Sequence, residues 1–185
     1  MKVILVIIFL TFGIYKTTAQ GIFTEKGKFS ADAGFGYIIS DDFNALSYNL
    51  SASLLGVIDL GFNYFRALPS DNFKRAEGNT GYIDFFVKKD SLYGIVLNMA
   101  FSTVNYESAF LAGLSIYSKL NSLNGFPFNI APYFSLGYLT TDDIAAGFGI
   151  AVERKINKNF SIVITPAVNA GNLTQIVLGL EFIVQ

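Results

Sequence analysis

The sequence lacks two residue types that carry much of protein chemistry, because its 185 residues include neither cysteine nor histidine. Without cysteine the chain can form no disulfide framework and offers no thiol. Without histidine it lacks the commonest general base and the commonest metal ligand, and a Ser/His/Asp triad is excluded. We therefore expect a protein that is not an enzyme, with no catalytic residue, no cofactor and no metal.

Long apolar runs and charged residues are also scarce. Hydrophobic residues make up 52% of the chain and charged residues only 15%. No apolar run beyond residue 15 reaches the roughly 20 residues that a membrane-spanning helix needs. A bilayer admits only helices or closed β-barrels, because every backbone polar group in it must be paired. An apolar chain without spanning helices therefore favours a β-barrel.

The start of the chain has the parts of a secretory signal peptide. Lys2 gives it a basic beginning, residues 3–14 are apolar, and a polar region ends in the small residue Ala19. This order is typical of an exported protein that is cleaved after the small residue. Without residues 1–19, which hold two lysines and no acid, the chain has 13 − 2 = 11 basic and 14 acidic residues, and this net charge of −3 does not suggest nucleic-acid binding. The predicted organisation is a signal peptide at 1–19, a short leader at 20–27 and a β-barrel at 28–185.

Residues 144–153 alternate strictly between two kinds of side chain. The even positions from Ile144 to Val152 are all apolar, whereas the odd positions are alanine or glycine until Glu153. A period of two is the signature of a β-strand with two unlike faces. One bulky apolar face and one small face suit a strand with lipid outside and a tight interior.

The same pattern recurs along the chain and predicts ten strands. The runs are close to the 9–11 residues that a tilted strand needs to cross the hydrocarbon layer. Their even spacing and short turns are typical of an all-β, up-and-down antiparallel barrel, with outward aromatic residues near both ends. Eight strands are the alternative if two runs are not independent. The predicted strands are 28–39, 45–55, 57–65, 81–88, 92–103, 109–119, 128–139, 144–153, 160–168 and 174–184.

The positions of proline and glycine predict features of the barrel wall and of its interior. Pro132 and Pro166 fall inside predicted strands, where each removes a ladder donor, and we expect a β-bulge at each. Glycines are frequent on the predicted inner face, where a small barrel curves strongly. Phe86, Tyr117 and Tyr133 are predicted to point inward beside these glycines. The lumen should therefore be mostly filled, since wide channels belong to larger barrels.

Charged residues on the predicted inner face gather toward the end of the barrel that holds both termini. Isolated buried charges are costly, so we expect these groups to be paired and to close the lumen. A structural cluster is favoured over a proton or ion path, because structural ion pairs readily imitate functional ones. The predicted lumen charge cluster consists of Lys28, Asp32, Asp59, Asp84, Lys88, Lys119, Glu153 and Glu181.

The longest predicted connection, residues 66–80, should lie outside the cell, because such barrels have short periplasmic turns and longer outer loops. Acidic pairs in two other loops, at 41–42 and 142–143, are expected to be solvated turn residues rather than calcium ligands, since each loop offers few oxygen ligands. The candidate residues of the surface contact loop are Arg66, Asp71, Phe73, Lys74 and Arg75.

The signal peptide, the alternating strands and the last stretch TQIVLGLEFIVQ together resemble the small bacterial outer-membrane β-barrel proteins of the OmpA type. The resemblance covers nearly all of the chain beyond residue 19 and implies a location in the bacterial outer membrane. It also implies contact with outer-membrane lipids and lipopolysaccharide, and insertion by the barrel assembly machinery. It indicates no specific protein or ligand partner.

Three functions are compatible with these features. The leading hypothesis is a non-enzymatic integral outer-membrane barrel with a structural or surface-interaction role and a largely filled lumen. The first alternative is a narrow pore for small solutes or ions. The second is a soluble periplasmic barrel carrier, which would turn its large apolar side chains inward and its small, weakly charged face outward. Soluble proteins normally cover themselves with mixed charge, which disfavours this reading.

Overall fold

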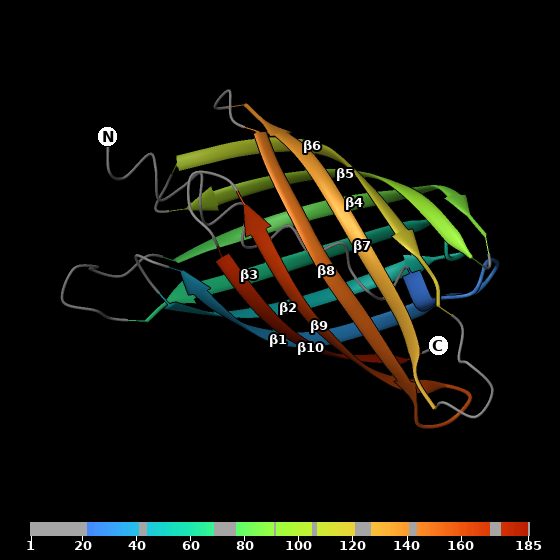
Figure 1. Ribbon diagram of the computed structural model, residues 1–185. Helices are drawn as coiled ribbons and strands as arrows, with labels where there is room; N and C mark the ends of the chain where they lie inside the picture. The colour runs from blue at the N-terminus through green and yellow to red at the C-terminus, as the bar shows by residue number, and fades with distance from the viewer. Residues whose placement is uncertain are drawn as a thin grey trace.

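The computed structural model describes residues 22–40, 44–68, 77–90, 92–104, 107–120, 127–140, 144–170 and 175–184. In these ranges ten antiparallel strands close into one barrel, each beside its neighbour in sequence and β1 beside β10 (Figure 1). The strands are β1 (Ser30–Ser40), β2 (Asn44–Leu54), β3 (Ile58–Ala67), β4 (Glu77–Lys89), β5 (Tyr93–Val104), β6 (Glu107–Ser118), β7 (Asn129–Leu139), β8 (Ile144–Lys155), β9 (Phe160–Ala170) and β10 (Gln175–Val184).

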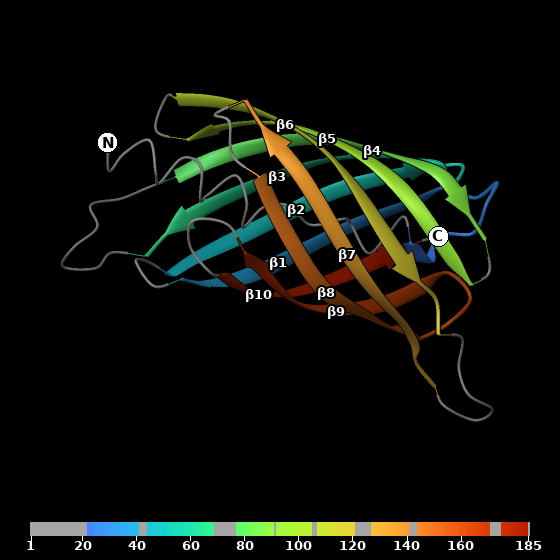
Figure 2. The same cartoon turned by 45° about the horizontal axis from the view of Figure 1, so that its top comes forward.

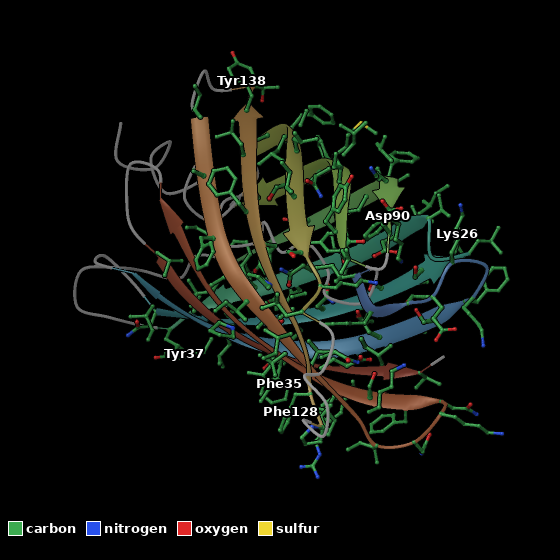
Figure 3. All side chains as sticks on the ribbon, turned by 45° about the vertical axis from the view of Figure 1, so that its right-hand side comes forward. Lys26, Phe35, Tyr37, Asp90, Phe128 and Tyr138 are labelled. Carbon is green, nitrogen blue, oxygen red and sulfur yellow. The ribbon has the colours of Figure 1, made fainter. Side chains whose placement is uncertain are left out.

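The closed barrel confirms the predicted ten-stranded, up-and-down architecture, and its wall is visible from a second side in Figure 2. Alternation sets the faces as the sequence indicates. On β8, Phe148 is 53% exposed, whereas its neighbours Gly147 and Gly149 are buried. Phe35 and Tyr37 likewise project outward from β1 (Figure 3). Among the described residues, no helix is long and apolar enough to cross a membrane.

The two ends of the barrel differ. Ser30 begins β1 and Val184 ends β10 at one end, which we call the termini end, and the tight turn at 55–57 lies there too. Gly56 in this turn has a φ of 60°, a conformation that glycine adopts without steric cost. The opposite end, where β3 finishes and β4 begins, is called the loop end. Figure 3 labels Lys26 and Asp90, which both belong to the termini end.

One β-bulge changes the predicted faces of β4. Phe86 pairs with Val96, but the next pair joins Lys88 to Ile95, so Val87 is the extra residue. A bulge of this kind puts two residues opposite one and reverses the alternation that follows. Lys88 therefore shares the outer face with Ile95, and Lys89 takes the inward position. The predicted inward position of Lys88 is wrong for this reason.

The two strand prolines interrupt the ladders without a bulge. Between β8 and β9, pairing stops after the Gly149–Ala167 pair and resumes at the Val152–Ile164 pair in the same register. Pro166 lies in this gap and therefore outside the β8–β9 ladder. Between β6 and β7, the ladder likewise ends just before Pro132. A missing donor can be tolerated by omitting a pair, so the predicted bulges at both prolines are wrong.

Strands β3 and β4 also run further than predicted. Arg66 pairs in register with Glu77, and Phe65 pairs with Gly78. A Cβ on Gly78 would lie 2.6 Å from the Phe65 ring, so only glycine leaves room for that ring. The predicted loop at 66–80 is therefore shortened from both sides, because its flanking residues extend the sheet.

Candidate functional site

A short segment that precedes β1 in the sequence lies inside the barrel. Ile22, Phe23 and Thr24 form a short turn at the termini end and are 0%, 7% and 0% exposed (Figure 1). Ile22 and Phe23 belong to the buried apolar cluster inside the barrel. The Thr24 hydroxyl is 2.5 Å from the Ser30 hydroxyl, which ties this turn to β1. We call residues 22–24 the plug.

The chain between the plug and β1 is held against the β2–β3 turn. The Gly27 amide donates to the Leu55 carbonyl at 2.8 Å. A Cβ on Gly56 would lie 2.5 Å from the Glu25 carbonyl oxygen, so the two backbones are in close contact. The predicted short leader at 20–27 therefore includes an internal plug. The sequence does not predict it, because two apolar residues are too few to show a periodicity.

Four acids of the predicted lumen charge cluster are buried inside the barrel, with Asp32 5%, Asp59 0%, Asp84 3% and Glu153 1% exposed. Three of them accept a hydrogen bond from an asparagine on a neighbouring strand. Such bonds supply the polar partner that a buried carboxylate needs. The pairs are Asp32 with Asn49 (3.0 Å), Asp84 with Asn98 (2.8 Å) and Glu153 with Asn129 (2.6 Å).

Sequence reasoning missed these asparagines, although the signal was present. Each lies on the inner face of its strand, and Asn98 and Asn129 stand directly opposite their acids in the strand pairing. The Ser115 hydroxyl extends one of the pairs by donating to Asn98 at 2.7 Å. The acids thus belong to a network of neutral amides and hydroxyls rather than to a band of ion pairs alone.

Lys89 supplies a positive charge to this interior. Its ammonium donates to the Gly56 carbonyl at 2.8 Å and lies 4.5 Å from the centroid of the Phe86 ring. It also interacts electrostatically with Asp59, whose backbone position pairs with Asp84. Lys89 therefore occupies the place predicted for its neighbour and ties β4 to the β2–β3 turn.

The three lysines of the predicted lumen charge cluster, Lys28, Lys88 and Lys119, lie in different surroundings. Lys88 lies outside, 3.5 Å from the Asp90 carboxylate, with its ammonium above the Tyr93 ring. Lys28 is exposed before β1 begins. Lys119 is half-buried; burial lowers the pKa of its ammonium, while Glu153 raises it. The side chain of Glu181 lies outside the described residues.

The two adjacent lysines offer a direct test of the bulge. Lys89→Met should lower the free energy of unfolding by about 1.5–3 kcal/mol, because it removes one charged hydrogen bond inside the barrel. Lys88→Met should leave stability unchanged, because its contacts are exposed. Chemical denaturation of the refolded variants measures both. A larger loss for Lys88→Met would mean that β4 has the unbulged register.

Tyrosine rings fill much of the remaining interior by lying over glycines of the adjacent strand. Tyr117 and Tyr133 are 2% and 4% exposed, and Phe86 is 6% exposed, so the three predicted inward aromatics are confirmed. The glycines matter because a Cβ in their place would overlap the ring. The pairs, with the closest distance from that Cβ to the ring, are Gly61 with Tyr82 (2.0 Å), Gly94 with Tyr117 (2.3 Å) and Gly149 with Tyr133 (2.4 Å).

The predicted surface contact loop is described only in part. Arg66 lies in β3 and is exposed at the loop end. The other candidates, Asp71, Phe73, Lys74 and Arg75, lie outside the described residues, as do the acidic pairs at 41–42 and 142–143. Within the described part of the chain, no group of three or more acids could hold a metal ion.

No protein-family model and no curated protein matches the chain. Among solved structures it is similar to the KdgM porin, with 12% identity over 82% of this chain and 98% of that chain and a TM-score of 0.48. It is also similar to the β domain of the Bordetella autotransporter BrkA, with 8% identity over 87% of this chain and 100% of that chain and a TM-score of 0.47. The strand pairing itself defines the class, a closed ten-stranded β-barrel with its bulky apolar face outside.

Proposed function

We propose that the protein is a non-enzymatic integral β-barrel of the bacterial outer membrane, with a structural or surface-interaction role and a closed lumen. The outer surface carries this proposal, because every strand exposes a large apolar side chain there. Lipid is the solvent that such a continuous apolar surface needs. Examples, one from each strand in order, are Phe35, Leu50, Phe62, Val87, Phe101, Ile116, Leu136, Phe148, Ile164 and Phe182, which are 38–64% exposed.

Aromatic pairs near both ends support the same location. Tyr48 and Tyr64 stack at 6.5 Å on the half of the wall toward the loop end, and Phe160 and Phe182 stack at 6.3 Å toward the termini end. Aromatic girdles at two heights are typical of membrane barrels. A soluble carrier would need these large side chains inside, so the outward apolar face supports a membrane barrel over that alternative.

The closed lumen is proposed from the plug together with the inward tyrosines. Ile22 and Phe23 occupy the termini end, and Tyr117 and Tyr133 cover glycines within the same buried cluster. The alternative of a narrow pore draws support from the loop half of the lumen. There the wall is polar, and the Thr80 hydroxyl donates to Ser102 at 2.9 Å.

Conductance separates the two functions. The refolded protein, added to planar lipid bilayers, should insert and give no reproducible current steps, because the plug and the tyrosines block the lumen. Heat-modifiable migration on a gel confirms in parallel that the barrel is folded. Regular steps from the folded protein would contradict the closed lumen and favour a pore for small solutes or ions.

A further inference from the structure

A slot on the outer face interrupts a row of aromatic side chains. Gly81 of β4 stands in register between Phe62 of β3 and Phe101 of β5, and Phe101 stands beside Phe110 of β6. A Cβ on Gly81 would meet nothing within 4 Å. The slot has a volume of about 420 Å³, and Leu60, Ile83, Met99, Phe101 and Phe110 line it.

The slot has an apolar interior and a polar end. Leu60, Ile83 and Met99 lie toward the termini end, and none of the described residues that line the slot is charged. Toward the loop end, the next outward pair is Asn79 with Tyr64, followed by Glu77 with Arg66. This order, apolar and then polar along one strand direction, matches a lipid whose acyl chain lies along the wall below its headgroup.

Polar groups at the loop end can contact a phosphorylated headgroup. Arg66 is exposed there, and a guanidinium matches the geometry of phosphate oxygens. The Tyr64 hydroxyl donates to the Glu77 carboxylate at 3.1 Å, which holds these two side chains together above the slot. Burying an acyl chain in the slot is favourable only where the chain displaces water, so shape and the headgroup contact must supply the selectivity.

We propose that the Gly81 slot binds one acyl chain of a lipopolysaccharide molecule, with a headgroup phosphate near Arg66. This inference rests on the proposed function, because the slot faces lipid only if the barrel spans the outer membrane. In such a barrel the loop end faces outward. The slot then lies at the level of the outer leaflet, where lipopolysaccharide rather than phospholipid supplies the acyl chains.

Filling the slot provides the test. Gly81→Leu puts a leucine side chain into the open space, and Ala146→Leu puts the same side chain at an outward position of β8 as a control. The barrels are refolded in detergent, mixed with lipopolysaccharide or with phosphatidylethanolamine, and their bound lipids are counted by native mass spectrometry. The natural chain and the control should retain one lipopolysaccharide. Gly81→Leu should weaken that binding at least tenfold, and Arg66→Gln should weaken it less.

Two results would overturn the proposal that the slot binds lipopolysaccharide. One is equal lipopolysaccharide retention by Gly81→Leu and Ala146→Leu, and the other is equal retention of phosphatidylethanolamine by the natural chain. Heat-modifiable migration shows that each variant is folded, so a loss of binding cannot come from misfolding. A chain that fails to insert into bilayers would refute the proposed function instead. That result can be told apart from failure of the slot proposal, in which the barrel inserts but Gly81→Leu binds as much lipopolysaccharide as the control.

Discussion

Phe148→Arg should lower the free energy of unfolding in lipid vesicles by about 2–4 kcal/mol. Phe148 lies near the middle of β8, on the outer face, and is 53% exposed. Its neighbours in register are Phe134 and Val168, both outward and apolar, so no polar partner is available across the strands. An arginine there would put a charge near the bilayer midplane, where its transfer cost is greatest.

A second arginine on the same strand is the matched control. Ile144 is the first residue of β8, lies on the same face and is 69% exposed. Because it lies at the loop end, near the membrane interface, Ile144→Arg should cost only about 0–1 kcal/mol. Denaturant titrations of both variants in the same vesicles give the comparison. Equal costs at the two depths would contradict a membrane-spanning β8.

Gly94→Ala should destabilise the barrel by about 1–3 kcal/mol through overpacking. The new Cβ would lie 2.3 Å from the Tyr117 ring, which is only 2% exposed. That ring also meets Phe86 edge to face, with 6.1 Å between the centroids, so it cannot move without losing packing. Denaturant unfolding measures the loss.

Two variants separate this effect from a general cost of replacing glycine in a strand. Gly81→Ala should be close to neutral, because a Cβ there meets nothing within 4 Å. In a Tyr117→Ala background, Gly94→Ala should also become cheaper, since the obstructing ring is gone. A cost for Gly94→Ala that persists in that background would show that Tyr117 does not fill the space above Gly94.

The architecture is predictable from sequence because it depends on a local property. A period of two is visible in any run of about ten residues, so all ten strands and the outward face of residues such as Phe148 follow from the pattern. The inward aromatics Tyr117 and Tyr133 follow from the same alternation. These features need no knowledge of which residue pairs with which.

The remaining features depend on strand pairing and could not be predicted in the same way. Two adjacent lysines give no sign of which faces inward, so the bulge at Val87 is invisible in the sequence. The asparagine partners of the acids become apparent only when the register is known. The plug also has no periodic signal, because Ile22 and Phe23 are buried by a barrel that forms elsewhere in the chain.

Site-directed labelling tests the orientation of the side chains most directly. The natural chain has no cysteine, so single cysteines can be introduced at Leu60, Phe148, Ile164 and Ser161 and labelled with a fluorophore. In vesicles that contain nitroxide lipids, the first three labels should be strongly quenched, because these positions face outward. The label at Ser161, which is 3% exposed on the inner face, should be protected. Strong quenching at Ser161 with protection at the other three would contradict a barrel that turns its bulky face to lipid.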